Sequence, residues 1–396
     1  MAITTSDYLN QLITDKQDLV DNLTEQGIEG LTGDETFTEL VPKVLDIQTG
    51  GGDLDWDALG LQSFEDYSTE NYQEAEELHD NWDSSITSMN YKYQKSNIAF
   101  FPKVDTSNVL MATRAFESAF SLLFVSDIIA PNCTSINNCF NGAYSLKKIG
   151  NIKLADGADI MGAFLNCYSL EGIGVLDFKP SSNCSGVFAG CYSLETAPMI
   201  DTSNVTNAYN MFGNCEKLKN IPLYNMLNVT DCSRMFYNCK SVEEIPNFNL
   251  PSVITLSAFC QGCSLILRTP SITTSSNLKN TNSIFNGCTQ LLEATAFDTS
   301  AVTDFGYMFS NCSSLRKLPI FNTSAVTNFN GFISGCRSLT DESLNNILQM
   351  CINATAFSGT KKLTTLGLSN SYYSASRIQS LPSYQDFIDA GWTIGY

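Results

Sequence analysis

The stretch that decides the fold is DTSNVTNAYNMFGNCEKLKNIP, residues 201–222, which returns as DTSAVTDFGYMFSNCSSLRKLP at residues 298–319. Weaker copies fill most of residues 98–340. One column of cysteines marks the period: Cys167, Cys191, Cys215, Cys239, Cys263, Cys288, Cys312 and Cys336. Their spacing is 24 residues, with a single step of 25 between Cys263 and Cys288. A fixed period of this length predicts a solenoid of stacked coils.

Apolar residues recur at the same period. A phenylalanine precedes each of these cysteines by three or four residues: Phe164, Phe188, Phe212, Phe236, Phe259, Phe285, Phe309 and Phe332. Phe116 and Phe140 extend this column backwards, with Ala119 and Ala143 at the cysteine position. Leucine or valine follows it: Leu122, Leu146, Leu170, Leu194, Leu218, Val242, Leu291, Leu315 and Leu339. A valine precedes it in Val205, Val229, Val253, Val302 and Val326. One copy has too few apolar positions to form a core, so about ten copies must stack, each Phe on the next.

Three short pieces make up each copy. SLxxIP is apolar at both ends and stops at proline, which is typical of a short strand. DTSNVT predicts an Asx turn, and Asp105, Asp201 and Asp298 alternate there with Asn225, Asn249 and Asn322, since either side chain can accept the same backbone hydrogen bond. NMFxNC predicts a single helical or 3₁₀ turn that directs Phe inward. Ile200, Tyr224, Phe248, Phe297 and Phe321 precede the Asx turn in register, which favours a place in the core.

The repeat MFxNCxxLxxIPxxDTSxVT resembles the BspA-type leucine-rich repeats of bacterial and phage surface proteins. The resemblance covers roughly residues 98–340. It implies an α/β solenoid, a right-handed rod of about ten 24-residue coils. It also implies a role in adhesion, although repeats of this kind serve many partners.

The net charge of −19 is concentrated in residues 1–97, and no Lys or Arg lies between Lys43 and Lys92. An acidic segment disfavours nucleic acid and anionic membrane as partners. It serves either solubility or docking to a basic partner. We find no run of 18 apolar residues and no secretory signal in the first twenty residues, MAITTSDYLNQLITDKQDLV.

Fourteen cysteines could indicate disulfides, but eight share one column, where a small buried hydrophobe fits. We therefore expect reduced thiols and folding in a cytosol. Cys260 and Cys263 have the spacing of a metal or redox pair, yet no second pair lies at ligand distance and the single histidine, His79, is far away in sequence. We expect no metal and no cofactor.

Residues 1–49 are predicted to be a helical attachment module. Its apolar residues recur at helical intervals, and the candidates for attachment are Tyr8, Leu12, Leu19, Leu23, Phe37 and Leu40. Two short helices bury little alone, so we expect them to pack on a second copy or on another protein. This module resembles the short N-terminal module of phage tail or fibre proteins, which implies attachment to a virion and a homo-oligomer, a trimer by preference.

Two caps are predicted to flank the solenoid of residues 98–340. Residues 50–97 begin with a glycine joint and continue as an acidic and aromatic N-terminal cap, with a solvated helix face at Glu74–Asp80. Residues 341–396 form the C-terminal cap, which opens on a capped amphipathic helix, DESLNNILQMC.

The residues between the Leu column and the following Ile or Pro vary freely. The candidate recognition face comprises Lys147, Glu171, Glu195, Lys219, Glu243, Arg316 and Lys317. A variable face on a rigid ladder of coils is where such solenoids bind; the alternative is a solvated strand face.

No GxSxG, Walker A, HExxH or GxGxxG motif is present, and one histidine leaves little for general-base chemistry, so we expect no enzyme. Two functions remain. The favoured one is a phage virion protein, a tail or head fibre or spike assembled in the host cytoplasm, whose solenoid binds a host surface protein or glycan. The alternative is a bacterial cell-surface adhesin of the same repeat family. No nucleic acid and no membrane insertion are expected.

Overall fold

The computed structural model describes residues 69–395. It divides into two compact units, Met1–Tyr72 and Gln73–Tyr396. The predicted attachment module, residues 1–49, with Tyr8, Leu12, Leu19, Leu23, Phe37 and Leu40, lies outside the described residues. Residues 73–395 belong to the second unit, which contains all of the predicted repeats.

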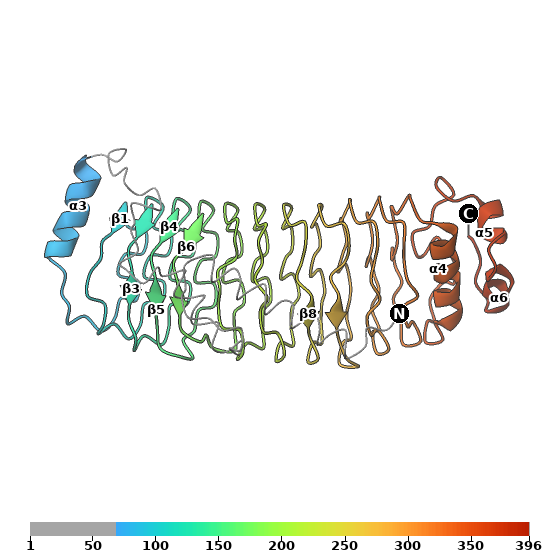
Figure 1. Ribbon diagram of the computed structural model, residues 1–396, viewed down its shortest axis with the longest axis horizontal. Helices are drawn as coiled ribbons and strands as arrows, with labels where there is room; N and C mark the ends of the chain where they lie inside the picture. The colour runs from blue at the N-terminus through green and yellow to red at the C-terminus, as the bar shows by residue number, and fades with distance from the viewer. Residues whose placement is uncertain (1–68, 396) are drawn as a thin grey trace, which may run out of the picture. The chain divides into compact units, whose positions relative to one another are not determined.

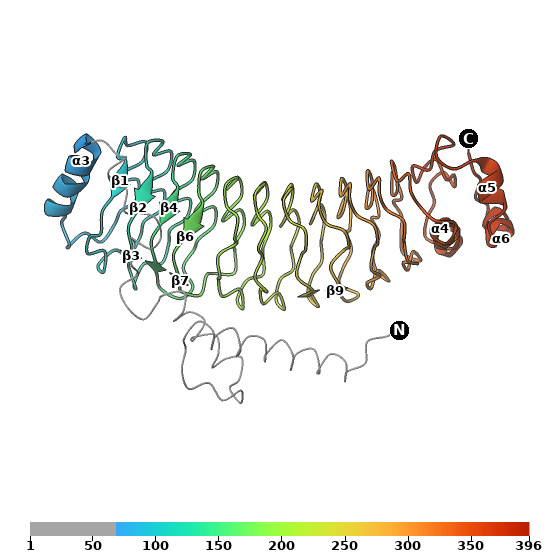
Figure 2. The same cartoon turned by 45° about the horizontal axis from the view of Figure 1, so that its top comes forward.

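The second unit is a solenoid of stacked coils (Figures 1 and 2). The coils pair in parallel, each residue meeting the residue one repeat later. One column of single bridges joins Asn183 to Asn207, Asn207 to Asp231 and Asp231 to Thr255. The predicted 24-residue register is therefore confirmed: the main chain of each coil pairs with that of the next coil at a shift of one repeat.

Regular strands are short and confined to part of the solenoid. One parallel sheet has the order β1 (Phe100–Phe101), β2 (Phe124–Val125), β4 (Lys148–Ile149), β6 (Gly172–Ile173). A second has the order β3 (Ile128–Ile129), β5 (Ile152–Lys153), β7 (Leu176–Asp177), and a third pairs β8 (Phe248–Asn249) with β9 (Ile272–Thr273). In the other coils the same positions are held by single bridges and by backbone hydrogen bonds.

The phenylalanine column contributes a stack of buried aromatic rings to the core. Phe140, Phe164 and Phe188 are buried and stack face to face, with ring centroids 5.5 and 5.3 Å apart. Ile200, Tyr224, Phe248 and Phe321 are buried as predicted, while Phe297 is half-buried against the core. At about 25 cal/mol per Å² of apolar surface, this continuous core supplies most of the stabilisation of the solenoid.

Two assignments to the phenylalanine column are wrong. Phe259 meets Phe236 edge to face, at 78°, and Phe332 meets Phe309 at 73°. The column position itself is occupied by the next residue, Cys260 in one coil and Ile333 in the other. The hydrogen bonds of the cysteine column show this for Cys260. The Cys288 thiol donates to the Cys260 carbonyl, whereas in other coils the thiol donates to a phenylalanine carbonyl, as from Cys239 to Phe212.

The NMFxNC segment is not a helical turn, which corrects the prediction from sequence. It contains two residues of positive φ, for example Asn210 at 54° and Asn214 at 62°. The same two positions are left-handed in successive coils, where they hold Gly186 and Gly190, or Arg234 and Asn238. A left-handed residue reverses the chain direction, so the segment turns the corner of the coil instead of winding a helix.

The Asx turns are confirmed. Asp201 and Asp298 each accept a hydrogen bond from the amide two residues on, at 2.9 Å, and Asn322 does the same at 3.1 Å. The backbone amide of Ser300 and then its side chain hold the pKa of Asp298 below its usual value. These carboxylates therefore serve as turn caps.

Aromatic residues close the N-terminal end of the core. Helix α3 (Thr69–Asp80) carries exposed Glu74, Glu77 and Asp80, as expected of a solvated face. Trp82 packs edge to face on Phe101, and Tyr93 stacks on Phe116 with centroids 5.2 Å apart. Tyr93 thus continues the phenylalanine column into the first coil.

Three helices cover the other end. Helix α4 (Asp341–Asn353) begins at its N-cap Thr340, whose side chain accepts from the Ser343 amide. It buries Leu344, Ile347, Leu348, Met350 and Cys351. The short helices α5 (Ala375–Gln379) and α6 (Tyr384–Asp389) follow, and Trp392 is fully buried behind them. Along residues 69–395, no helix combines the length and the apolar character that a membrane span requires.

Candidate functional site: an exposed side-chain column

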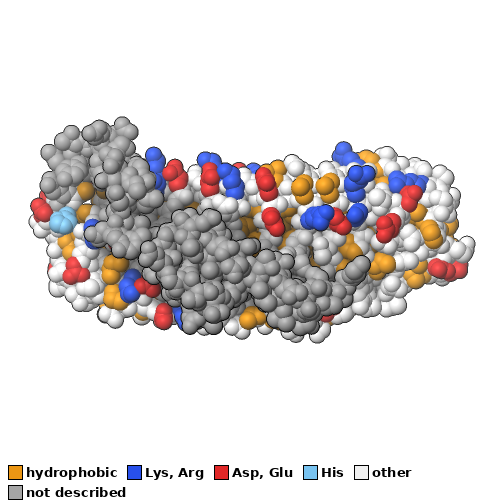
Figure 3. All heavy atoms as spheres, in the orientation of Figure 1, with side chains coloured by type: hydrophobic (Ala, Val, Ile, Leu, Met, Phe, Trp, Pro, Cys, Tyr) orange, Lys and Arg blue, Asp and Glu red, His pale blue; other side chains and the backbone are white. Residues whose placement is uncertain are grey.

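Six of the seven predicted recognition residues lie in one column, which we call the recognition column. It holds Lys147, Glu171, Glu195, Lys219, Glu243, Leu267, Leu292 and Arg316, one residue in each successive coil, and all eight are exposed. Main-chain hydrogen bonds fix the spacing, as from the Glu171 amide to the Lys147 carbonyl at 2.8 Å. Charged side chains gather in a row over the coils in Figure 3. The structure therefore brings six of the seven predicted residues together on a backbone that holds them in register.

Lys317 does not belong to this column. It lies in the neighbouring column, where its ammonium group is 3.7 Å from Glu293, and Arg268 contacts the same carboxylate at 3.6 Å. Lys219 and Glu195 form a similar pair within the recognition column, at 3.0 Å. Exposed pairs of this kind contribute only about 0.2–1 kcal/mol each, so they order the surface more than they stabilise the fold.

Two apolar residues of the column were missed from the sequence. Leu267 is 50% exposed and Leu292 is 42% exposed, and they occupy adjacent coils. The Leu292 amide donates to the Leu267 carbonyl at 2.8 Å. The sequence signal was their place in the repeat, because both leucines occupy the position that holds Lys or Glu in other coils. They interrupt the charged column with an apolar step that a partner could cover.

A second outward column was also missed. Phe120, Tyr144, Tyr168 and Tyr192 directly follow the alanine and cysteine positions of their coils and stack in succession along the surface. Their spacing of 24 residues is visible in the sequence, but an aromatic residue at this period is also what a core position would show.

The cysteine column has a structural role. Each thiol donates to a main-chain carbonyl of the preceding coil, for example Cys191 to Phe164 at 3.2 Å. All fourteen cysteines are free and buried. Burial raises the pKa of Cys184 and of Cys336 to about 12, and raises the pKa of Cys260 well above its usual value. Thiols in this state are poor nucleophiles and poor metal ligands.

Cys260 and Cys263 do not belong to a larger group of possible metal ligands within residues 69–395. Both side chains are buried in the core. In the part of the chain from residue 69 to residue 395, no group of three or more His, Cys, Asp or Glu side chains could hold a metal ion.

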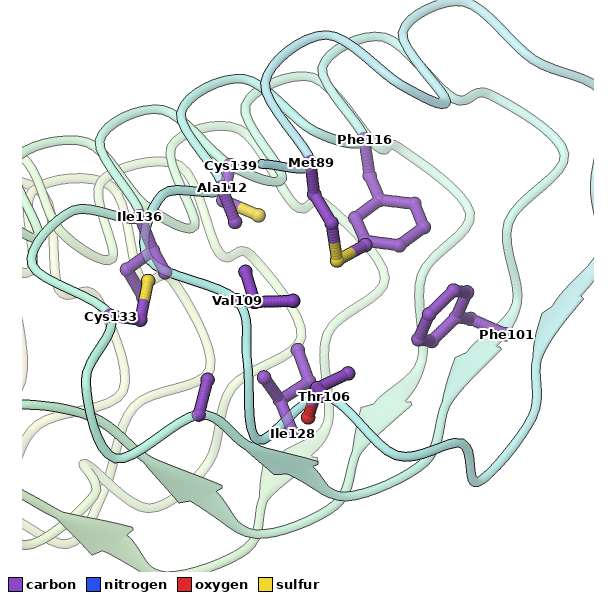
Figure 4. A pocket seen from close by; sticks show the side chains of 11 residues that line it. Met89, Phe101, Thr106, Val109, Ala112, Phe116, Ile128, Cys133, Ile136 and Cys139 are labelled. Atoms are coloured by element: carbon purple, nitrogen blue, oxygen red, sulfur yellow. The ribbon is translucent and has the colours of Figure 1, made fainter. Parts of the chain in front are cut away.

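One internal cavity lies at the N-terminal end of the core (Figure 4). It measures about 10 Å³, and its lining is apolar apart from the buried hydroxyl of Thr106, which has no hydrogen-bond partner. The small side chains of Ala112 and Ala130 leave this space. A water molecule needs about that volume and two to four polar partners, so the cavity is a packing defect and not a ligand site.

The fold and the outward columns define a solenoid repeat protein with an extended exposed surface. The chain belongs to the family described as "Mycoplasma protein of unknown function, DUF285", whose model matches residues 158–275 and 271–366, more than half of the chain. No curated protein matches it.

Two solved structures are reported as similar to this chain. One is a leucine-rich cell surface protein from Faecalibacterium prausnitzii A2-165, with 16% identity over 67% of this chain and 84% of that chain, and a TM-score of 0.31. The other is a leucine-rich repeat protein from Eubacterium ventriosum ATCC 27560, with 17% identity over 59% of this chain and 77% of that chain, and a TM-score of 0.30. Similarities at this level carry no argument about function.

Proposed function

We propose that this chain is a non-enzymatic, adhesin-type repeat protein of a bacterial cell surface, whose solenoid binds a partner through the recognition column. One observation carries the proposal: the column presents one exposed side chain per coil, on a main chain that keeps the register of one repeat. Such a surface can vary its chemistry without cost to the core.

The chemistry of the column suits a large partner. Glu195 and Lys219 neutralise each other, so this part of the column offers hydrogen bonds without a strong net field. Leu267 and Leu292 add an apolar step in the same column. Several weak contacts at fixed spacing sum to a useful affinity when the partner spans them together.

The buried nucleophiles support the absence of catalysis in this proposal. The thiols are neutral and hydrogen-bonded inside the core, as for Cys191. The turn carboxylates Asp201 and Asp298 are committed to backbone amides.

Location at a bacterial surface rests on the resemblance of the repeat to BspA-type surface repeats. The alternative context of a phage virion receives no support from the description of the family. Attachment and oligomerisation through residues 1–49 stay predictions.

The first test is location. Antibodies raised against the solenoid should stain intact cells of the producing organism, and brief protease treatment of those cells should remove the signal. Staining that appears only after the cells are opened would contradict the proposal.

The second test is recognition. Beads coated with the full chain should adhere to immobilised mucin, a mixed surface glycoprotein. A charge-swapped variant, Glu195→Lys with Lys219→Glu, keeps the cross-coil ion pair and should adhere less. Swapping Lys153 with Asp177, a pair 2.6 Å apart outside the column, is the matched control and should leave adhesion unchanged. Equal behaviour of the two swaps would assign recognition to another face.

A further inference from the structure

The second outward column forms an aromatic strip, which we define as Phe120, Tyr144, Tyr168 and Tyr192. Successive ring centroids are 5.1, 4.5 and 4.9 Å apart. Phe120 is 52%, Tyr144 41% and Tyr192 39% exposed, and Tyr168 is partly exposed. Four neighbouring aromatic side chains on a protein surface are unusual, since exposed apolar residues are ordinarily scattered.

The main chain fixes the strip. A left-handed residue lies two positions before each aromatic residue, such as Gly142 at φ 74° before Tyr144 and Gly190 at φ 77° before Tyr192. The carbonyl of Tyr144 accepts from the Ser169 amide and that of Tyr168 accepts from the Ser193 amide, both at 3.1 Å. The rings are therefore ordered before any partner arrives, which lowers the entropic cost of binding.

The strip presents ring edges and hydroxyl groups to solvent. Tyr144 and Tyr168 are stacked with only 10° between their ring planes, so each covers a face of the other. Desolvation raises the pKa of the Tyr168 phenol, and the neighbouring phenols of Tyr144 and Tyr192 raise it further. A partner would meet a row of hydroxyl groups at a repeat of about 5 Å.

Within its own four coils, the positions directly flanking the strip hold no charged residue. On one side the flanking residues are Ser121, Ser145, Ser169 and Ser193, and on the other they are Ser118, Gly142, Asn166 and Gly190. Serine hydroxyls, asparagine amides and phenols can all donate and accept hydrogen bonds. One coil further, the same column changes to Glu216, which pairs with Lys240 at 2.7 Å. The uncharged surface is therefore confined to the coils that carry the aromatic strip.

We propose that the aromatic strip is a binding site for an extended, uncharged polysaccharide that runs along the solenoid. A polymer of linked pyranose rings repeats its hydroxyl groups at a spacing close to that of the coils. Each sugar can then meet the phenol, serine and asparagine groups of one coil, while the ring edges contact its C–H groups. This inference rests on the proposed function and names the class of partner for a second outward column of the same solenoid.

The observations favour this partner over two others. An anionic polymer or surface would need Lys or Arg along the whole strip. The directly flanking positions of its four coils contain neither, and the nearby Lys147 is followed in the recognition column by Glu171 and Glu195. A folded protein partner does not match a repeat of identical groups at one fixed spacing, whereas a polymer does, and each added repeat strengthens binding by avidity.

The experiment is affinity electrophoresis of the full chain in native gels that contain mixed-linkage β-glucan, xyloglucan or galactomannan, with alginate as the anionic polymer. We expect retardation by at least one neutral polymer and none by alginate. The variant Tyr144→Ala with Tyr168→Ala should bind at least about tenfold more weakly. Tyr144→Phe with Tyr168→Phe keeps the stack and loses the hydroxyl groups, so its loss should be intermediate.

The matched control is Tyr209→Ala with Tyr307→Ala, which removes two exposed tyrosines from other positions of the coil. This control should bind as the unmodified chain does, and all variants should show unchanged thermal unfolding. The proposal is overturned if no neutral polymer retards the chain, if alginate retards it more, or if the control loses binding equally. Binding of the chain to cells is a further check. The proposal is also overturned if protease treatment of the cells abolishes this binding and periodate oxidation of their sugars leaves it unchanged. In each of these cases the surface location and the charge-swap result would still stand, so the two proposals fail separately.

Discussion

The carbonyl oxygen of Phe188 accepts two hydrogen bonds, one from the Cys191 amide in its own coil at 3.1 Å and one from the thiol of Cys215 in the next coil at 3.2 Å. A carbonyl has two lone pairs, and here both are used. The fully buried thiol also fills a small space in the core. This relationship explains why one column selects cysteine when alanine or valine would be as apolar.

The first prediction concerns this thiol. Cys215→Ala should lower the free energy of unfolding by about 1–2 kcal/mol, because it removes the thiol donor and a little volume. Cys215→Val should cost more, about 1–3 kcal/mol, because valine also loses the donor and overfills the space. Urea unfolding monitored by circular dichroism measures both. A valine variant as stable as the unmodified chain would show that the hydrogen bond and the tight fit do not matter.

The second prediction separates core from surface. Phe212 is fully buried between Phe188 and Phe236, so Phe212→Ala should cost about 3–5 kcal/mol. Glu195→Ala removes an exposed charge and should cost less than about 0.5 kcal/mol. If the two variants unfold at the same urea concentration, the assignment of inward and outward columns is wrong.

The third prediction concerns the left-handed corner. Ala258 has φ 56°, a conformation that costs an L-residue roughly 1–2 kcal/mol, so Ala258→Gly should stabilise the solenoid or leave it unchanged. Ala208 is buried near the same corner two coils earlier and is not left-handed. Ala208→Gly should therefore destabilise by about 0.5–1 kcal/mol. Thermal unfolding should show a lower unfolding temperature for Ala208→Gly and no loss for Ala258→Gly, and equal losses would contradict the strain at Ala258.

Much of this architecture was predictable from the sequence because the solenoid repeats one local solution. The buried columns at Phe, Cys, Leu and Val follow from the period alone. The period does not determine which of two adjacent apolar residues occupies the position in the buried column. For Phe259 and Cys260 the main-chain position decided it, and the larger side chain turned edge to face instead.

The corner and the outward columns were harder to predict. Asn210 and Asn214 in NAYNMFGNC can support either a helical turn or two left-handed residues, and only the closure of the coil selects the second. Tyr168 at a fixed period is equally compatible with a core and with a surface strip. Whether a repeated apolar residue points inward depends on the path of the main chain around it, which no local pattern specifies.

The last prediction concerns alkaline pH. Burial raises the pKa of the native thiols, to about 12 for Cys184 and Cys336, whereas an unfolded cysteine titrates near 8.5. Below the unfolded pKa both states hold the proton, so the full stability is present. Above it the unfolded chain releases protons that the native chain retains, and stability falls as pH rises toward the native pKa, by about 1.4 kcal/mol per pH unit for each thiol.

The urea midpoint should thus be nearly constant from pH 7 to 8 and should fall steeply between pH 9 and 10. In the same range, native thiols should react slowly with Ellman's reagent and quickly once urea is added. Cys215→Ala removes one such group and should flatten the slope by about one proton, which separates the thiols from the tyrosines and lysines that titrate near pH 10. A urea midpoint that does not change between pH 8 and pH 10 would mean that the cysteine column is open to solvent. That result would contradict the buried, hydrogen-bonded thiols described above.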